Sequence, residues 1–218
     1  MEIKSLSLVK EHYHKGRTVL SYDLSYPELS PPSAALRRIN YENKRMIFDI
    51  VNKTERNVFK AAVRQSEILG DTFSTLSVTA SYQTMYLHNG LFSAFTDVFY
   101  SLGAEGSTMK RMSQTRSLTS GRQVPLRGLF KGRCDFRHVL FNELSSKISD
   151  YEKQNGELCY PDWRAKAMRI IDKSCYYLTD DGIALFFPQG SISAAVWGIP
   201  TFLIEYDRLK SVTARRML

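Results

Sequence analysis

The chain has 218 residues, of which 43% are hydrophobic and 24% are charged. This length suits one domain or two small lobes that share a core, and this composition excludes a disordered or fibrous protein. No apolar run is long enough to span a membrane, and the first residues lack the apolar stretch of a signal peptide. We therefore expect a cytoplasmic protein from the sequence as it stands, or an extracytoplasmic one if an export segment has been removed.

The first third of the chain predicts a strand followed by a long helix. Residues 18–26 are typical of a strand, and the prolines that follow argue against a central strand or a helix interior there (Pro27, Pro31 and Pro32). Ser33 has the side chain of an N-cap, apolar residues then recur every three or four positions, and Gly70 is a stop signal. We expect this amphipathic helix to pack on a sheet.

The middle of the chain predicts a hairpin. Residues 75–87 alternate between apolar and polar side chains, as a half-buried strand does. Residues 91–103 have apolar side chains on both faces, which predicts a strand that is covered at least in part on both sides. Asn89 and Gly90 lie between them, and both tolerate the positive φ angles of a type I′ turn.

The net charge of +8 is concentrated in residues 107–133, which contain no acidic side chain and which we call the basic segment. Its basic residues are Lys110, Arg111, Arg116, Arg122, Arg127, Lys131 and Arg133. A turn signal at residues 119–122 predicts a second hairpin from Thr108 to Arg127. A cluster of one sign creates a local field that favours an anionic partner, although lysines and arginines that protect an edge strand would have the same composition.

The last third of the chain predicts two helices and three strands. Helical spacing of apolar residues runs from residue 135 to 148 and from 162 to 173, with a polar loop between. Strands are expected at residues 176–178, 183–187 and 201–206, with a loop containing a helical turn at residues 188–200. The whole pattern predicts an α+β fold. We expect antiparallel or mixed sheets with helices packed on one face.

The sequence contains no zinc-protease, serine-elbow or phosphate-loop motif, so we expect no cofactor and no metal. His12 and His14 could chelate a metal from one face of a strand, but no third ligand is near. Cys134, Cys159 and Cys175 show no C-x-x-C spacing, which favours reduced thiols.

Paired carboxylates for hydrolysis require a tertiary cleft that brings acids together from distant segments. The candidates are Asp97, Glu105, Glu205 and Asp207.

Four stretches together carry a family resemblance: "VLSYDLSYPEL", "RINYENKRMI", "GRQVPLRGLF" and "LTDDGIALFFPQGSISAAVWGIPTFLIEYDRL". In their order and spacing the chain resembles the extracytoplasmic domain of the lysozyme-sensing anti-sigma factors of Gram-positive bacteria, which also accompanies some peptidoglycan deacetylases. The resemblance implies a two-lobed α+β fold, with a strand-helix-strand lobe in residues 1–95 and a second lobe in residues 96–218 that is similar to a subdomain of the actin-like ATPases. It also implies a non-catalytic sensing module, with lysozyme-type hydrolases as a known class of partner.

We therefore expect a non-catalytic binding module of the Gram-positive cell envelope or spore, which binds an anionic glycan polymer or a protein. Its predicted site is Lys110, Arg111, Arg116, Arg122 and Arg127. The basic segment would repel a basic lysozyme, and it lacks the interleaved aromatic residues of a single-strand nucleic-acid binder. Two alternatives stay open. One is an enzyme that acts on cell-wall carbohydrate through paired carboxylates, and the other is an interaction domain whose partner meets an exposed Trp197.

Overall fold

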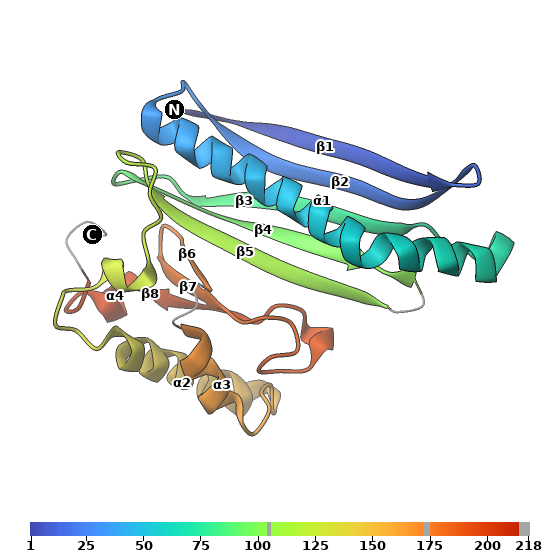
Figure 1. The fold of residues 1–218 in the computed structure, drawn as a ribbon. Coiled ribbons are helices and arrows are strands. Elements are labelled where there is room, and N and C mark those ends of the chain that lie inside the picture. Colours follow the sequence, from blue (N-terminus) through green and yellow to red (C-terminus); the bar gives the residue numbers. More distant parts are fainter. Residues whose placement is uncertain (104–105, 172–174, 214–218) are drawn as a thin grey trace. The chain divides into compact units, whose positions relative to one another are not determined.

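The computed structural model describes residues 1–103, 106–171 and 175–213, and the chain forms two compact units (Figure 1). Unit 1 consists of residues 1–82 and 96–109, and unit 2 consists of residues 83–95 and 110–218. Five strands form one mixed sheet in the order β1-β2-β3-β4-β5, and three further strands form a second sheet in the order β6-β7-β8. The boundary between the units passes through β3, β4 and β5. The fold is α+β, as the sequence predicts.

Unit 1 combines a strand pair with a long helix. Strands β1 (Glu2–His14) and β2 (Arg17–Ser30) pair antiparallel, and β2 pairs in parallel with the start of β3 (Leu76–Tyr86). Helix α1 (Ala34–Leu69) connects β2 to β3, because parallel strands need a crossover connection. Strands β4 (Leu91–Ser101) and β5 (Ser107–Ser117) complete the sheet.

Helix α1 begins and ends at the predicted residues. The Ser33 hydroxyl accepts a hydrogen bond from the backbone N–H of Leu36 at 3.2 Å, and Gly70 ends the helix with a φ of 51°. The helix is a single element of 36 residues, and α1 packs on β2 through apolar side chains such as Ile39 and Ile47, both fully buried. Figure 1 shows α1 running along this strand pair.

The predicted end of β2 at the prolines is wrong, because β2 continues through Pro27 to Ser30. Pro27 is tolerated because the register pairs β2 with β3 only over Leu20–Leu24, so this end of the strand has β1 as its partner. Beyond Leu24 the hydrogen bonds between β2 and β3 are missing, and two side chains of α1 take their place. The amide of Asn40 bonds both the N–H and the carbonyl of Leu29, at 2.9 and 3.0 Å, and buried Asn43 donates to the carbonyl of Pro27 at 2.9 Å.

Strand β1 is not predicted by the sequence analysis. It is a polar edge strand with no fully buried residue, and it carries exposed lysines such as Lys4 and Lys10. Edge strands need charge to prevent pairing with other chains, so their apolar alternation is weak. The same property that protects the edge conceals the strand in the sequence.

Unit 2 encloses the larger apolar core. Helices α2 (Phe136–Asn155) and α3 (Trp163–Ile171) pack together, and α2 also packs on the three-stranded sheet. That sheet consists of β6 (Tyr176–Leu178), β7 (Gly182–Phe186) and β8 (Thr201–Glu205), all antiparallel and all at the predicted positions. A short helix α4 (Tyr206–Leu209) follows β8 and was not predicted. The core includes fully buried residues of both helices and the sheet: Leu140, Leu144, Ile148, Ala167, Leu178 and Ile183.

Both predicted turns of the sheets are present. Asn89 and Gly90 have φ angles of 53° and 72°, and the N–H of Leu91 donates to the carbonyl of His88 at 2.8 Å, as a type I′ turn requires. The loop between β7 and β8 contains the predicted helical turn, which is η4 (Ala195–Trp197).

The predicted hairpin of the basic segment is wrong in its second half. Only β5 is a strand there, and a single bridge between Arg116 and Gln123 follows it before the chain enters a 3-10 turn, η3 (Leu126–Leu129). Pro125 prevents a longer ladder, because proline has no N–H to donate. The basic segment is therefore one strand followed by a folded loop.

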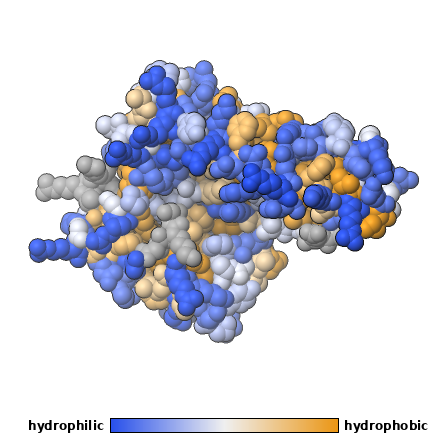
Figure 2. Space-filling view, in the orientation of Figure 1, coloured by the Kyte–Doolittle hydropathy of each residue, from blue (hydrophilic) through white to orange (hydrophobic). Residues whose placement is uncertain are grey.

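Among the described residues, no helix is long and apolar enough to cross a membrane. Figure 2 shows one face of the molecule, on which hydrophilic residues cover most of the surface and hydrophobic residues occur in smaller groups between them.

Candidate anion-binding site

Arg111 of β5 is half-buried and belongs to the packing of unit 2. Its guanidinium carbon lies 3.9 Å from the ring centroid of Phe95, and further rings lie at 5.8 Å (Tyr177) and 5.9 Å (Phe186). The guanidinium also donates to the hydroxyl of Thr201 at 3.1 Å. This geometry is a cation–π stack that covers an aromatic cluster. Arg111 therefore has a structural role that the sequence analysis did not foresee, whereas its neighbour Lys110 is exposed.

Arg116 and Arg122 shape the turn at residues 119–122. The guanidinium of Arg116 donates to the side chain of Gln114 at 2.8 Å and to the carbonyl of Gly121 at 3.2 Å. The carbonyl of Arg122 accepts from the N–H of Ser117 at 3.0 Å, and the Arg122 side chain is exposed. Arg116 thus stabilises the loop, and Arg122 extends from it.

Arg127 and Lys131 hold the chain between η3 and α2. The Arg127 guanidinium donates to the carbonyls of Cys134 and Gly132, and it lies 5.5 Å from the ring of Phe136. The ammonium of Lys131 donates to the carbonyl of Ser211 at 2.6 Å. Both cations donate hydrogen bonds to backbone carbonyls, so part of the basic segment stabilises its own fold.

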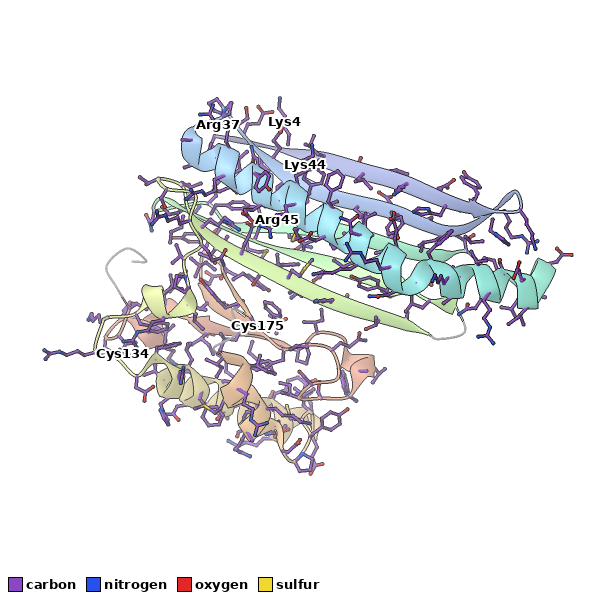
Figure 3. The ribbon with its side chains drawn as sticks, viewed as in Figure 1. Lys4, Arg37, Lys44, Arg45, Cys134 and Cys175 are labelled. Carbon is purple, nitrogen blue, oxygen red and sulfur yellow. The ribbon has the colours of Figure 1, made fainter. Side chains whose placement is uncertain are left out.

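Arg127 nevertheless lines an open hollow of about 520 Å³ at the N-terminus of α2, which we call the arginine hollow. Its lining residues are Arg127, Gly132, Arg133, Cys134, Asp135, Phe136 and Arg137. Three arginines and one aspartate therefore line one space. Figure 3 shows Cys134 beside the start of α2.

The single carboxylate of the arginine hollow is already occupied. Asp135 is the N-cap of α2, and its side chain accepts from the backbone N–H of His138 at 3.3 Å and bonds the His138 ring at 2.7 Å. The hydrogen bonds from His138 lower the pKa of Asp135. The positive end of the helix dipole adds to the three guanidinium charges, so this space favours an anion.

Of the five predicted site residues, only Arg127 lines the hollow. The hollow also contains Arg133, another member of the basic segment, and Arg137. The sequence analysis missed Arg137 because it follows Asp135, where the acid-free run ends. The N-cap at Asp135 was the signal that could have identified Arg137, because a predicted N-cap places residues 133 and 137 on either side of one helix start.

Two of the candidate catalytic carboxylates, Glu205 and Asp207, lie close together, but neither has the raised pKa of a general acid. Glu205 and Asp207 line a second hollow of about 310 Å³, together with Glu143, Ser146, Lys147, Asp150 and Arg208. A hydrogen bond from Lys147 at 2.6 Å lowers the pKa of Glu205, and a hydrogen bond from Lys210 lowers the pKa of Asp207. A general acid for glycoside hydrolysis needs a raised pKa, so neither group fits that role. Asp97 lies on β4 in unit 1, and Glu105 lies outside the described residues.

His12 and His14 bond separate carboxylates, at 2.8 Å to Glu55 and 3.0 Å to Glu67. No group of three potential metal ligands occurs within residues 1–103, 106–171 and 175–213. The three cysteines are partly buried and unbridged, and burial raises the pKa of Cys159 to about 11. A thiol with that pKa is a poor nucleophile at neutral pH.

Comparisons with known proteins find a match to a family of unknown function. Residues 128–207, from η3 to α4, match the family model described as "Protein of unknown function (DUF3298)". No curated protein sequence matches the chain.

Two solved structures share the fold over nearly their whole length. A member of the DUF3298 family from Bacteroides fragilis has a TM-score of 0.68 at 13% identity and covers 99% of this chain and 94% of its own. A DUF3298 family protein from Pseudomonas aeruginosa has a TM-score of 0.61 at 13% identity and covers 100% of this chain and 97% of its own. At this identity the likeness shows the fold alone, and the predicted link to anti-sigma-factor sensors remains a prediction.

Proposed function

We propose that this chain is a non-catalytic binding module and that its arginine hollow binds the phosphate or carboxylate groups of an anionic polymer. The observation that carries the proposal is the convergence of Arg127, Arg133 and Arg137 on one space at the start of a 20-residue helix. Guanidinium groups match phosphate and carboxylate in geometry as well as in charge.

The hollow is preorganised for such a ligand. Arg127 is fixed by two backbone carbonyls and by Phe136, so it loses little conformational entropy when an anion arrives. Arg133 and Arg137 are exposed and can close on the ligand from both sides. Asp135 offsets one of the three positive charges, which leaves the space net positive.

The charge of unit 2 supports capture of a polymer. In the sequence, unit 2 has 18 basic and 11 acidic residues, whereas unit 1 has 12 and 11. The excess in one unit attracts a polyanion from a distance, and the hollow then supplies the short-range contacts. The resemblance of the sequence to envelope sensors makes a cell-envelope glycan the first polymer to consider.

The test compares two double variants of equal charge. Arg133→Ala with Arg137→Ala removes two guanidinium groups of the hollow, and Arg37→Ala with Lys44→Ala removes two exposed charges of α1. Binding of labelled polyphosphate and of polygalacturonate, which offer phosphate and carboxylate respectively, is measured by fluorescence anisotropy at 50 and 150 mM NaCl. We expect the hollow variant to bind roughly tenfold more weakly, since each charge-assisted hydrogen bond is worth about 1 kcal/mol or more.

The control variant should lose less than about twofold in affinity, because its charges lie outside the hollow. An equal loss in both variants would show that binding follows net charge alone. Failure of the parent chain to bind either polymer at 50 mM NaCl would remove the proposal.

The second candidate function is docking of a protein on the loop between β7 and β8. Val196 is 89% exposed and Trp197 is 59% exposed, which is the condition that the sequence analysis set for this alternative. The turn is rigid, because the N–H groups of Trp197 and Gly198 bond the carbonyls of Ala194 and Ala195, both at 3.0 Å. Trp is enriched among the residues that dominate protein interfaces, and a fixed backbone lowers the entropic cost of binding.

This second candidate is tested by affinity capture with Trp197→Ala and, as a control, Tyr151→Ala, another exposed aromatic residue of unit 2. A partner that docks on the loop should be retained by the parent and by the control and lost from the Trp197 variant. Equal retention by all three chains would exclude the loop as the docking surface.

A further inference from the structure

Helix α1 presents a cationic outer face that the proposed function does not use. Its basic residues are all exposed: Arg37, Arg38, Lys44, Arg45, Lys53, Arg56, Lys60 and Arg64. They are eight of the 12 basic residues of unit 1, although that unit is close to neutral in total. Its positive charge is therefore segregated onto one helix face.

Two of the four acidic residues of α1 are engaged by the strand pair, and the other two lie beside Arg45. Glu55 accepts from Lys10 and His12, and Glu67 accepts from His14 and Lys15, so both acids are engaged by the β1–β2 pair. Glu42 and Asp49 lie 3.8 and 4.0 Å from the Arg45 guanidinium. In the described part of the chain, no carboxylate forms an ion pair with Arg37 or Lys44.

Aromatic side chains interrupt the cations near the start of the helix. Tyr41 is 64% exposed and Phe48 is 44% exposed. The order Arg37, Tyr41, Lys44, Phe48 has spacings of four, three and four, which place these side chains in one stripe. The Lys44 ammonium lies 5.8 Å from the Phe48 ring centroid. Figure 3 shows Lys4 of β1 at the same end of the unit as Arg37 and Lys44.

We propose that this outer face of α1 docks unit 1 onto the surface of an anionic lipid bilayer, with the helix parallel to the bilayer plane. The cations from Arg37 to Arg64 extend along about 40 Å of helix, at ~1.5 Å per residue. The stripe of Arg37, Tyr41, Lys44 and Phe48 points in one direction, so a flat layer of anionic headgroups can approach these side chains at once. Each cation near such a surface increases partition roughly fivefold. Tyr41 and Phe48 lie where interfacial aromatic residues would enter the headgroup layer.

The same features fit other anionic partners less well. The phosphates of a nucleic-acid duplex wind away from a straight helix within one turn of about 34 Å, and an exposed Phe gains nothing from them. A standard protein interface covers about 800 Å² per partner, and the width of such a patch is shorter than the length of this row of cations. A plane that carries both negative charge and an apolar layer accounts for the length of the row and for its aromatic residues.

The experiment is co-sedimentation of the full chain with phosphatidylcholine vesicles and with vesicles that contain 30% phosphatidylglycerol, at 100 mM NaCl. We expect binding to the anionic vesicles only. Arg37→Gln with Lys44→Gln should lower partition at least tenfold, whereas Arg133→Gln with Arg137→Gln, the matched pair from the arginine hollow, should change it less than twofold. Phe48→Ser should lower vesicle partition about threefold and leave the binding of polyphosphate unchanged.

The result separates this proposal from the proposed function, because the two pairs of variants act on different ligands. No binding of the parent to anionic vesicles would overturn the docking surface while leaving polymer binding in place. Equal losses from both pairs would assign membrane binding to net charge. An unchanged partition of Phe48→Ser, or tighter binding to duplex nucleic acid with the same dependence on Arg37 and Lys44, would also overturn it.

Discussion

The two units use their cations in opposite ways. Unit 1 has almost as many acidic as basic residues, yet its arginines and lysines gather on the outer face of α1. Unit 2 has the net positive charge. The guanidinium groups of Arg111, Arg116 and Arg127, however, contact aromatic rings or donate to backbone carbonyls of the same unit. Net charge therefore does not locate a binding surface. The surface is defined by the cations that remain accessible after the fold has satisfied its own carbonyls and rings.

The units also differ in how their layers are joined. Helix α1 is tied to β2 by two amide side chains, Asn40 and Asn43, in addition to apolar packing. Helix α2 is joined to its sheet by apolar packing and, nearer the surface, by the ion pair of Lys147 with Glu205 at 2.6 Å. Strand β7 approaches β8 so closely that one position tolerates only a hydrogen atom. Unit 1 should therefore be sensitive to lost hydrogen bonds, and unit 2 to added volume.

The largest expected effect is that of Gly182→Ala in unit 2. A Cβ atom at residue 182 would lie 2.2 Å from the carbonyl oxygen of Ile204 and 2.9 Å from the Cα of Glu205, both backbone atoms that cannot turn away. We expect the free energy of unfolding to fall by about 3 kcal/mol, at the upper end for overpacking. Chemical denaturation measures this loss. Gly132→Ala is the control, because its Cβ would meet nothing within 4 Å, and it should change stability by less than about 0.5 kcal/mol. Equal stabilities of the two variants would contradict the close approach.

The sequence shows why a turn occurs near Gly182 but not why the residue must be glycine. An Asp-Gly pair indicates a tight turn, and the structure has one there, with the Thr179 hydroxyl accepting from the N–H of Gly182 at 3.1 Å. The φ of Gly182 is not in the left-handed region, so conformational freedom is not the reason. The reason is that Gly182 pairs with Glu205, a residue 23 positions later. A local sequence pattern cannot show how closely two such distant residues approach each other.

In unit 1 the expected loss is smaller. Asn43→Ala leaves the carbonyl of Pro27 without the hydrogen bond from the Asn43 amide, in a buried position. An unsatisfied buried acceptor costs about 2 kcal/mol. Asn52→Ala, at an exposed position of the same helix, should change the free energy of unfolding by less than about 0.5 kcal/mol. If the two variants unfold at the same denaturant concentration, the amide does not hold the strand end.

Local patterns in the sequence predict most elements, because helix periodicity, N-caps and turn residues are short-range signals. Ser33, Gly70 and the Asn89-Gly90 pair are all used as predicted. The end of β2 was misjudged because Pro27 is tolerated only through its pairing with β1 and the amides of α1, which are tertiary contacts. Strand β1 was missed because edge strands are polar.

The proposed site differs from the predicted site residues more than the fold differs from the predicted elements. The acid-free run and the arginine hollow lie in the same part of the chain, but the role of each cation depends on which carbonyl or ring the fold places beside it. Phe95 and Arg111 are 16 residues apart, and Lys131 and Ser211 are 80 apart. The number of charges along a sequence contains no information about such pairs. The prediction from charge therefore named five site residues, of which only Arg127 lines the arginine hollow.

The smallest expected effect is a pH dependence in unit 1. The pKa of Glu55 lies below its ordinary value near 4.5, mainly because Lys10 donates a hydrogen bond to the carboxylate and secondarily because His12 does. A folded-state pKa below the unfolded one gives stability that is present above pH ~4.5 and is lost as the pH falls through the folded-state pKa. Since the pair is close to the surface, we expect a loss of about 0.5 kcal/mol between pH 6 and pH 3.

Thermal unfolding of the parent and of Glu55→Gln across this range measures this loss, with Glu157→Gln, an exposed carboxylate of unit 2, as the control. The Glu55 variant should flatten the pH profile and the control should not, because Glu55 connects α1 to β1 through a charge that acid removes. Glu67, which bonds His14 of β1, stays in place in both variants. Identical profiles for all three chains would mean that the Glu55 interactions do not help to hold α1 on the sheet.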